Sequence, residues 1–466
     1  MEVGDGSGLT PENRKVNTIP EGITSRMLYN DVLRIAWPTF VELSLTQTAV
    51  MVNMMMVGWL GPWALSSVGL TTQPRFLLMT LFMALNVGAT AMVARNKGAG
   101  DREKANMTLR QALMLNLLLT IIMSVLGYIY AEHMVLFMGA PDAESLAGGT
   151  IYLRIQMLGF PLFAVTSTIT AALRGAGETR IAMFYNLASN IVNVPLGFIL
   201  IYGHLGFPRL EVAGAAIALV IAQGLAFVLA MIAVLSGKSY LHLRFRDGFM
   251  PNKEAIVQIT KIGIPSVMEQ MALRAGMIIY NRTVAGLGTL AFATHQIAFN
   301  IQAMSFMTGQ AFAVSATSLV GQSLGKKRPD MAHLYAARTR RVGMIFAVFL
   351  GIIFFVFGRQ VVGLYTDNQA IIELGGGIMM MMAFILPFQS SQFILAGALR
   401  GAGDTKSTAI IIFISVLIVR PFIAIFTIQF MELGLWGAWV AIVVDQLLRS
   451  GLVLFRFNSG RWKSVK

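Results

Sequence analysis

The chain has 466 residues, of which 56% belong to the hydrophobic set and only 12% are charged, whereas soluble domains carry about a quarter charged residues. A mean hydropathy of +0.68 indicates that lipid surrounds most of the chain, which excludes a soluble globular protein. The absence of cysteine excludes disulfides, Cys-ligated metals and thiol nucleophiles.

The N-terminal stretch, 1–28, is polar and carries charges of both signs. Because no apolar segment follows a basic one in this stretch, we expect no cleavable signal peptide. We expect it to form a flexible cytoplasmic tail.

Apolar runs interrupted by charged, Gly or Pro residues predict twelve membrane spans along the rest of the chain. A span with its connection takes roughly 30–40 residues, so this number fits the length. The expected spans are 31–57, 65–94, 108–131, 148–172, 180–202, 212–236, 256–285, 290–322, 338–358, 371–399, 405–430 and 433–456.

Lys and Arg residues are distributed very unequally between the two sides of these spans. The even-numbered connections and the termini, with the adjoining span ends, hold 27 of the 36 basic residues, and the odd-numbered connections hold only Arg209 and Arg359. By the positive-inside rule, both termini are expected in the cytoplasm of a cell whose plasma membrane holds the protein. The positive-inside rule therefore explains the net charge of +14, and we expect no nucleic-acid partner.

The two halves of the sequence resemble each other at a nearly constant offset in the numbering. The segment A-L-R-G-A-G-E-T at 172–179 recurs as A-L-R-G-A-G-D-T at 398–405, and Pro38 and Glu42 match Pro265 and Glu269. The offset is 226 for the first match and 227 for the second. Six spans separate the copies, and an even number returns the chain to the same side of the membrane. The repeats are therefore parallel and related by an axis along the membrane normal.

This repeat predicts an all-α integral membrane protein with twelve transmembrane helices in two six-helix lobes related by a pseudo-twofold axis. Secondary transporters bind their substrates between such lobes, so transport is the leading function. The chain has no G-x-x-x-x-G-K-[ST] loop for ATP. The expected organisation is an N-lobe at 29–237, a cytoplasmic linker at 238–255, a C-lobe at 256–457 and a basic cytoplasmic tail at 458–466.

Several motifs, in their order and twofold recurrence, resemble the multidrug and toxic compound extrusion (MATE) transporters. The resemblance runs from about residue 28 to the end of the chain. The segments that carry it are Pro38 to Glu42, Gln47-Thr48, V-G-W-L-G at 57–61, both A-L-R-G-A-G-[ED]-T segments, A-T-H-Q-I at 293–297, Arg420-Pro421 and Arg461-Trp462-Lys463.

The resemblance implies an antiporter that exports organic, often cationic compounds in exchange for inward H⁺ or Na⁺. Its expected partners are small-molecule substrates and membrane lipids. We expect a monomer with no cofactor apart from the coupling ion.

Three acids, Glu42, Glu269 and Asp445, lie deep within predicted spans, where a carboxylate is costly and indicates function by default. Glu42 and Glu269 each follow a proline by four residues, and a bend there would direct both carboxylates at the central cavity. Each could bind a cation, exchange a proton or contact a cationic substrate. The alternative is that each pairs with an arginine of its own lobe and only holds helices together.

Asn53 lies eleven residues after Glu42, about three helical turns, on the same face of the first span. The resemblance implies an aspartate of the ion site at this position. An asparagine can coordinate Na⁺ but carries no proton at neutral pH, so Glu42 could take over proton exchange.

Asn186, Asn190 and Asn193 share one face of the fifth span. They could contribute to the ion site, with Na⁺ near Asn53 and Asn190, or they could form hydrogen bonds between helices. The sequence leaves both interpretations open.

The second lobe differs chemically from the first. Tyr280 occupies the position that matches Asn53, and Gln389 occupies a position where the resemblance implies an acid in one branch of the family. Both are candidate ion or substrate residues. We expect Arg420 to pair with Asp445 or Glu269 in a structural role, because buried charges need partners.

Two other function classes compete with efflux. Residues 401–404 read G-x-G-D, a pattern found in intramembrane aspartyl proteases, but Glu178 in the first copy argues against catalysis. Glu178 and Asp404 instead are expected to cap the helices that follow them. The second alternative is a flippase for lipid-linked precursors, which would need arginines in the cavity.

Overall fold

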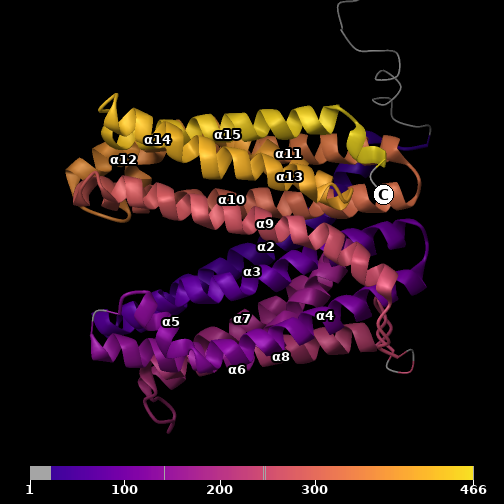
Figure 1. Ribbon diagram of the computed structural model, residues 1–466, viewed down its shortest axis with the longest axis horizontal. Helices are drawn as coiled ribbons and strands as arrows, with labels where there is room; N and C mark the ends of the chain where they lie inside the picture. Colours follow the sequence, from indigo (N-terminus) through magenta and orange to yellow (C-terminus); the bar gives the residue numbers. More distant parts are fainter. Residues whose placement is uncertain (1–21, 141, 245, 247, 465–466) are drawn as a thin grey trace, which may run out of the picture.

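The computed structural model describes residues 22–140, 142–244, 246 and 248–464. Most of the expected N-terminal tail, residues 1–21, and the last two residues of the expected C-terminal tail lie outside the described part. The rest of the chain forms long helices joined by short connections (Figure 1).

The first half of the chain forms a bundle of six long helices and one short one. Aspartate or asparagine side chains accept backbone N–H groups at several helix starts, which supplies partners that the helix itself lacks. The helices are α2 (Ser25–Gly58), α3 (Pro62–Gly98), α4 (Arg102–Ile129), α5 (Ala131–Phe137), α6 (Ala143–Gly175), α7 (Thr179–Tyr202) and α8 (Glu211–Leu235).

The second half repeats this bundle, with one interruption. Pro421 has no N–H, and just before it Arg420 donates its backbone N–H to Ser415, five residues earlier, so this stretch of the helix widens to π geometry. The elements are α9 (Lys253–Ala285), α10 (Thr289–Gly325), α11 (Pro329–Gly363), α12 (Gln369–Gly401), α13 (Thr405–Ile412), η2 (Phe413–Val419), α14 (Arg420–Gln429), α15 (Gly434–Asn458) and η3 (Arg461–Ser464).

All twelve expected spans correspond to helical segments, and most helices extend a few residues beyond the expected bounds. Among the described residues, ten helical segments are long and apolar enough to cross a membrane. The other two long helices, α9 and α10, fall short of that criterion, and α9 carries Lys261, Glu269, Arg274 and Arg282. Both helices contact the opposite lobe, where polar side chains need not face lipid.

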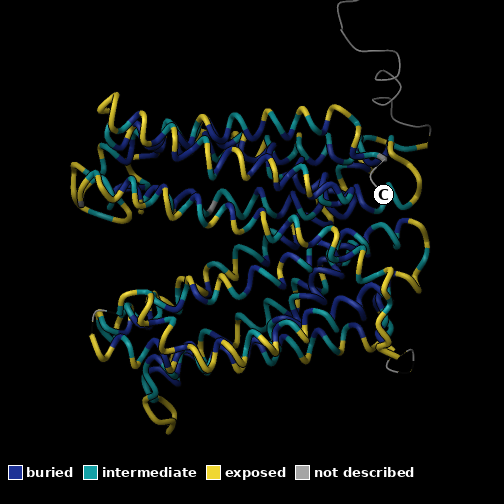
Figure 2. The backbone as a smooth tube through the Cα atoms, viewed as in Figure 1, coloured by how far each residue is buried: buried dark blue, intermediate teal, exposed yellow. Residues whose placement is uncertain are grey.

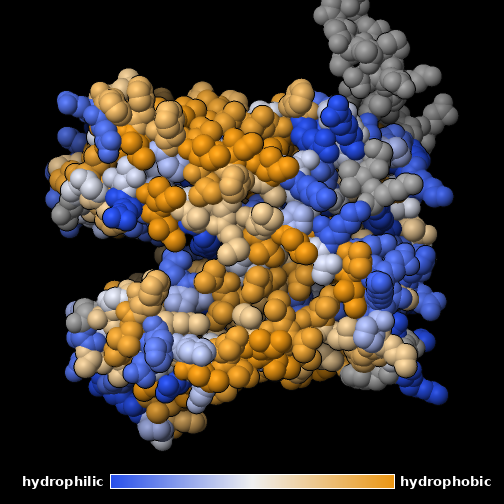
Figure 3. All heavy atoms as spheres, viewed as in Figure 1, coloured by the Kyte–Doolittle hydropathy of each residue, from blue (hydrophilic) through white to orange (hydrophobic). Residues whose placement is uncertain are grey.

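The two bundles form separate lobes that meet at one end of the molecule. In Figure 1 the lobes lie apart where α2 connects to α3 and α9 connects to α10, and they pack together at the end that holds the C-terminus. The space-filling view shows an open cleft between the lobes on the side away from the termini (Figure 3). On the face shown, apolar residues cover the middle of the molecule, and hydrophilic residues gather toward both ends.

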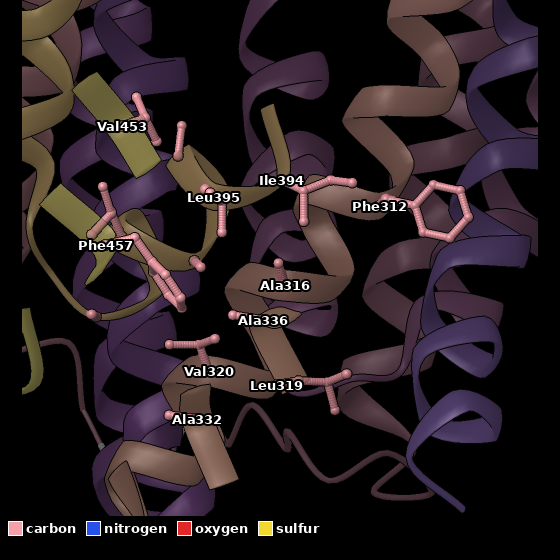
Figure 4. Packing of buried hydrophobic residues seen from close by; sticks show 14 of the residues in the cluster. Phe312, Ala316, Leu319, Val320, Ala332, Ala336, Ile394, Leu395, Val453 and Phe457 are labelled. Atoms are coloured by element: carbon pink, nitrogen blue, oxygen red, sulfur yellow. The ribbon is translucent and has the colours of Figure 1, made fainter. Parts of the chain in front are cut away.

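Buried side chains concentrate along the inner faces of each lobe (Figure 2). An apolar cluster near the closed end joins α2 of the N-lobe to α10, α11, α12, α13 and α15 of the C-lobe, with Phe312, Ile394 and Phe457 among its larger side chains (Figure 4). Trp462 of η3 stacks on Phe457 and completes this cluster. This cluster therefore packs the two lobes against each other at the closed end.

Closely packed glycines join α3 and α10 at the closed end, and the contact obeys the repeat. A Cβ atom on Gly98 would overlap the backbone oxygen of Gln322, and a Cβ on Gly325 would overlap that of Arg95. Gly98 and Gly325 are equivalent positions of the repeat at the offset of 227, and so are Arg95 and Gln322. The two helix ends thus cross reciprocally, with backbone against backbone.

Hydrogen bonds between the lobes reinforce the closed end. Ser318 Oγ and Gln322 Nε2 on α10 both donate to the backbone oxygen of Gly175, each at 3.1 Å. Tyr335 on α11 donates its hydroxyl to Asp31 on α2 at 2.7 Å. This end must separate if the cleft is ever to open toward the side of the termini.

Candidate functional site: two glutamate–arginine pairs

The carboxylate of Glu42, on α2, contacts two other helices of the N-lobe. Its Oε1 accepts hydrogen bonds from Arg174 Nη2 of α6 at 2.9 Å and from Asn186 Nδ2 of α7 at 2.7 Å. Glu42 is 5% exposed, and its Oε2 has no hydrogen-bond partner among the described residues. One oxygen therefore joins three helices, while the other is buried without a partner among the described residues.

Glu269 occupies the corresponding place in the C-lobe. Its Oε1 lies 3.6 Å from Arg400 Nη2 of α12, and its Oε2 accepts a hydrogen bond from Thr408 of α13 at 3.0 Å. Glu269 is 2% exposed. The two glutamates correspond at the repeat offset of 227 and their arginines at 226, so the ion pair is repeated with the fold.

Both carboxylates differ from the expectation that they face the central cavity, and each instead makes the alternative pairing with an arginine of its own lobe. Each is buried and turned into its own lobe, because the arginine that neutralises it lies on α6 or α12. Arg174 and Arg400 are the penultimate residues of those helices. The glutamates therefore lie toward the closed end of the molecule, within reach of the A-L-R-G-A-G segments.

A polar seam continues from Glu42 along the interface of α2 and α7. Asn190 Nδ2 donates to Thr46 Oγ1 at 2.9 Å, and Asn193 is buried, with no partner for its Oδ1 among the described residues. Asn53 faces α7 further along, with its Oδ1 near Gly197. Asn186 and Asn190 thus contact α2 directly, and Asn193 lies on the same face of α7 by helical spacing.

Glu42 and Asn53 do not share one coordination sphere. Eleven residues of α-helix separate them by about 16 Å. Asn190, paired to Thr46, lies between them along the seam. Thr46 lies about 10 Å of helix before Asn53, so the structure does not bring Asn53 and Asn190 together at the expected Na⁺ site.

Asp445 of α15 holds two arginines in the interior of the C-lobe. Its Oδ2 accepts from Arg420 Nε at 3.0 Å and from Arg449 Nη2 at 2.8 Å. All three side chains are at most 7% exposed. Arg449 was not among the candidates, although it lies one helical turn after Asp445.

The remaining candidates of the C-lobe lie inside the helix bundle. Tyr280 is 1% exposed, donates its hydroxyl to the backbone oxygen of Ala438 at 2.8 Å, and packs edge-on against His295. Gln389 borders a small cavity of about 20 Å³ between α10, α11 and α12, which has room for one water molecule. Neither polar atom of its side chain has a partner among the described residues.

The acids of the A-L-R-G-A-G-[ED]-T segments occupy the expected N-cap positions of α7 and α13, but their side chains accept no backbone N–H from those helices. Glu178 accepts the backbone N–H of Tyr240 at 3.0 Å and the hydroxyl of Ser239. Asp404 accepts from Arg456 of α15 at 2.7 Å. Glu178 thus holds the segment after α8, and Asp404 holds α15. The other oxygen of Asp404 accepts the hydroxyl of Ser407 in the first turn of α13 at 2.7 Å.

The arginines of the repeated segments were not among the predicted site residues. Arg174 and Arg400 lie at span ends, where a count of charges assigns them to the cytoplasmic loops or their borders. A signal was present, since Glu42 and Arg174 both recur in the second half at nearly the same offset. A residue pair that is duplicated together indicates a contact that both lobes retain.

The chemistry of these sites is that of carboxylates and amides. No group of three or more His, Cys, Asp or Glu side chains lies together within the described residues. The free carboxylate oxygen of Glu42 and the amide oxygens along α7 suit a proton or a hard monovalent cation.

Comparison with known families decides the class of protein. The MatE family model matches residues 38–199 and again residues 265–425, once in each lobe. The chain belongs to the MatE family. The two matches begin at Pro38 and Pro265, the same pair that marks the internal repeat.

Relatives of this MatE chain extend over nearly its whole length. The probable multidrug resistance protein NorM of Thermotoga maritima is 27% identical over 434 residues, 93% of either chain. The uncharacterized transporter YisQ of Bacillus subtilis is 27% identical and covers 92% of this chain and 93% of its own. The multidrug resistance protein PmpM of Pseudomonas aeruginosa is 26% identical, with 84% and 82% covered.

Solved structures share the fold of this MatE protein. A multidrug resistance MATE family transporter in an outward-facing conformation has a TM-score of 0.87 at 21% identity, covering 96% of this chain and 100% of its own. A MOP superfamily transporter from Pyrococcus furiosus has a TM-score of 0.86 at 21% identity, with 93% and 95% covered. The twelve-helix fold and the membership in a transporter family are thus established, and the chain is a multi-pass membrane transporter and not an enzyme.

Proposed function

We propose that this protein is a secondary active antiporter that exports organic, cationic or amphiphilic compounds by alternating access, coupled to inward H⁺ or Na⁺. The observation that carries the proposal is the duplicated ion pair, Glu42 with Arg174 and Glu269 with Arg400. An intramembrane acid that can change its charge gives a coupling ion a place to act. The names of relatives such as NorM and PmpM support drugs and toxic metabolites as substrates.

The coupling step follows from the contacts of Glu42. A proton or Na⁺ at its free Oε2 neutralises the carboxylate and weakens its attraction for Arg174. Because Arg174 lies next to Gly175, which accepts both hydrogen bonds from α10, release of Arg174 loosens the closed end between the lobes. Ion binding is thereby linked to the contact that must break for alternating access.

The direction of transport depends on orientation in the plasma membrane. The 27 basic residues of the even-numbered connections, the termini and the adjoining span ends support a cytoplasmic location of the closed end by the positive-inside rule. The cleft in Figure 3 then opens to the outside, which is the state from which an exporter releases its substrate. We propose that the transporter works as a monomer without a cofactor.

A flippase for lipid-linked precursors is the second candidate, because arginines of the C-lobe could bind a diphosphate. Arg420 and Arg449 are 5% and 4% exposed, and both already contact Asp445. Arginines committed to a buried aspartate are poor ligands for a headgroup. This arrangement favours efflux over lipid translocation.

The proposal is tested with the purified chain in proteoliposomes that contain a fluorescent organic cation such as ethidium. An imposed Na⁺ gradient and an imposed pH gradient are applied in separate experiments. Ethidium movement driven by one of them supports antiport and identifies the ion. If neither gradient drives ethidium or another organic cation, the proposed function is wrong.

A further inference from the structure

A groove on the outer face of α11 combines two arginines with apolar side chains. It has a volume of about 510 Å³ and is lined by Ala337, Arg340, Arg341, Met344, Ile345 and Val348. The spacing of these residues places them on one stripe of the helix. Ile345 and Val348 are 63% and 45% exposed, so the apolar part of the stripe is not covered by the protein.

The depth of the groove in the membrane follows from the sequence of α11. Arg341 and Arg359 enclose an uncharged, mainly apolar run at 342–358. Eighteen residues of helix span about 27 Å, close to the thickness of the hydrocarbon core. Arg340 and Arg341 therefore lie at headgroup level, and the side chains of Ile345 and Val348 lie beneath them among acyl chains.

The arginines at the top of the groove contact neutral oxygens. Arg340 Nε donates to Ser391 Oγ of α12 at 2.7 Å, and Arg341 Nη1 lies 3.5 Å from the hydroxyl of Tyr29 on α2. Arg338, next to the groove, also donates to Tyr29, at 3.1 Å. Within the described part of the chain, no salt bridge joins these three arginines to an acid.

We propose that this groove is a binding site for an anionic phospholipid. The phosphate lies between Arg340 and Arg341, and one acyl chain follows Met344, Ile345 and Val348. Positive charge at headgroup level above an open apolar stripe is complementary to a phospholipid, because each basic residue near the membrane surface attracts anionic lipids. A zwitterionic lipid gains less because its own cationic group opposes the arginines.

The site exists in only one lobe. The corresponding residues of α4, at offsets of 226 and 227, are Leu113, Met114 and Leu115, so the N-lobe lacks the charges. Because Arg341 also reaches Tyr29 on α2, the headgroup lies at the interface between the two lobes. A lipid bound there contacts the end of the molecule that is closed in this structure.

Because the chain has no cysteine, a single introduced cysteine can carry a fluorophore at one chosen position. Ile345→Cys carries a bimane fluorophore in the groove, and Leu118→Cys, its counterpart on α4 with 61% exposure, carries the same label as a control. The labelled full-length proteins are reconstituted in vesicles with rising fractions of brominated phosphatidylglycerol or brominated phosphatidylcholine, which quench bimane on contact.

At position 345 we expect half-quenching at a roughly fivefold lower fraction of phosphatidylglycerol than of phosphatidylcholine, the factor that one arginine near the headgroups supplies. At position 118 the two lipids should quench alike. Arg340→Gln/Arg341→Gln should make the two curves coincide at position 345. The control Lys238→Gln/Lys326→Gln, which removes two exposed charges elsewhere on the same end, should retain the preference.

Equal quenching by both lipids at position 345 of the otherwise unchanged chain overturns the proposal, as does a preference that survives loss of both arginines. If the double variant does not fold, Arg341→Gln alone retains the Arg340–Ser391 contact and should reduce the preference. A preference that appears only after removal of residues 1–21 would assign the groove to that segment and also overturn the proposal.

Discussion

Arg174 and Glu42 form an ion pair at 2.9 Å that joins the end of α6 to the middle of α2. The same relationship recurs in the C-lobe between Arg400 and Glu269. The A-L-R-G-A-G-[ED]-T segments therefore supply the partners of the two glutamates as well as the turns between helices. Loss of either charge leaves its partner buried without compensation, which is costly.

Glu42→Gln should flatten the pH dependence of efflux, because it removes the acid with a free oxygen on α2. Asn53→Asp should leave transport possible and add a second titration or a stronger Na⁺ response, since a carboxylate then lies about 16 Å further along the helix. Efflux of a fluorescent cation measured across a series of pH values checks both variants.

If Glu42 and Asn53 only bridge helices, Glu42→Gln changes thermal stability and leaves the pH profile of the surviving transport unchanged. That outcome would remove Glu42 from the coupling mechanism. Glu103→Gln, an exposed acid in the first turn of α4, serves as a control for a lost charge outside the seam.

Asp445→Asn should destabilise the C-lobe by about 3 kcal/mol or more, because it leaves Arg420 and Arg449 buried without their acid. Thermal unfolding of the purified protein in detergent measures the effect. Asp367→Asn removes an exposed aspartate from the same lobe and should change stability little. Equal melting temperatures for both variants would contradict the assigned ion pairs.

Gly98→Ala should weaken the closed end of the molecule, because the added Cβ overlaps the backbone oxygen of Gln322. Overpacking of this kind typically costs about 1–3 kcal/mol. We expect a cysteine introduced at Ser318, which is buried between the lobes, to react faster with a thiol reagent in this variant. Gly451→Ala, where nothing lies within 4 Å of the new atom, is the matched control and should not change the rate.

Orientation in the membrane is tested with single cysteines at Lys238, Lys326 and Glu144, all of which are exposed. Lys97 is a poorer position, because its amine contacts the backbone of Ala176. A membrane-impermeant thiol reagent added outside cells should label only the cysteine at 144. Labelling at 238 and 326 but not at 144 would reverse the topology.

Hydropathy and the internal repeat were sufficient to predict the helices and the parallel lobes. Both signals are periodic along the chain, so they do not depend on knowing which helices touch. The break in the eleventh span was missed, because Pro421 identifies the position of a disturbance but not the π geometry that η2 adopts around it.

Contacts between distant residues were predicted less well. The approach of Asp445 to Arg420 depends on how α14 and α15 pack, and hydropathy left Glu269 as an equal alternative. The role of Arg174 was missed, because span prediction assigns a residue at a helix end to the loop and does not show that its long side chain reaches back into the membrane. Glu178 was expected to cap α7, and only the fold shows that Tyr240 competes for it.

The central claim is that the two equivalent glutamate–arginine pairs, Glu42–Arg174 and Glu269–Arg400, both couple an ion gradient to export. The most direct measurement compares gradient-driven efflux with substrate exchange at equilibrium, in proteoliposomes that contain the unchanged chain, Glu269→Gln or the exposed control Glu254→Gln. We expect Glu269→Gln to lose gradient-driven efflux and to retain exchange at equilibrium. We expect Glu254→Gln to retain both. Normal gradient-driven efflux by Glu269→Gln at every pH would contradict the claim and leave the ion pair a purely structural contact.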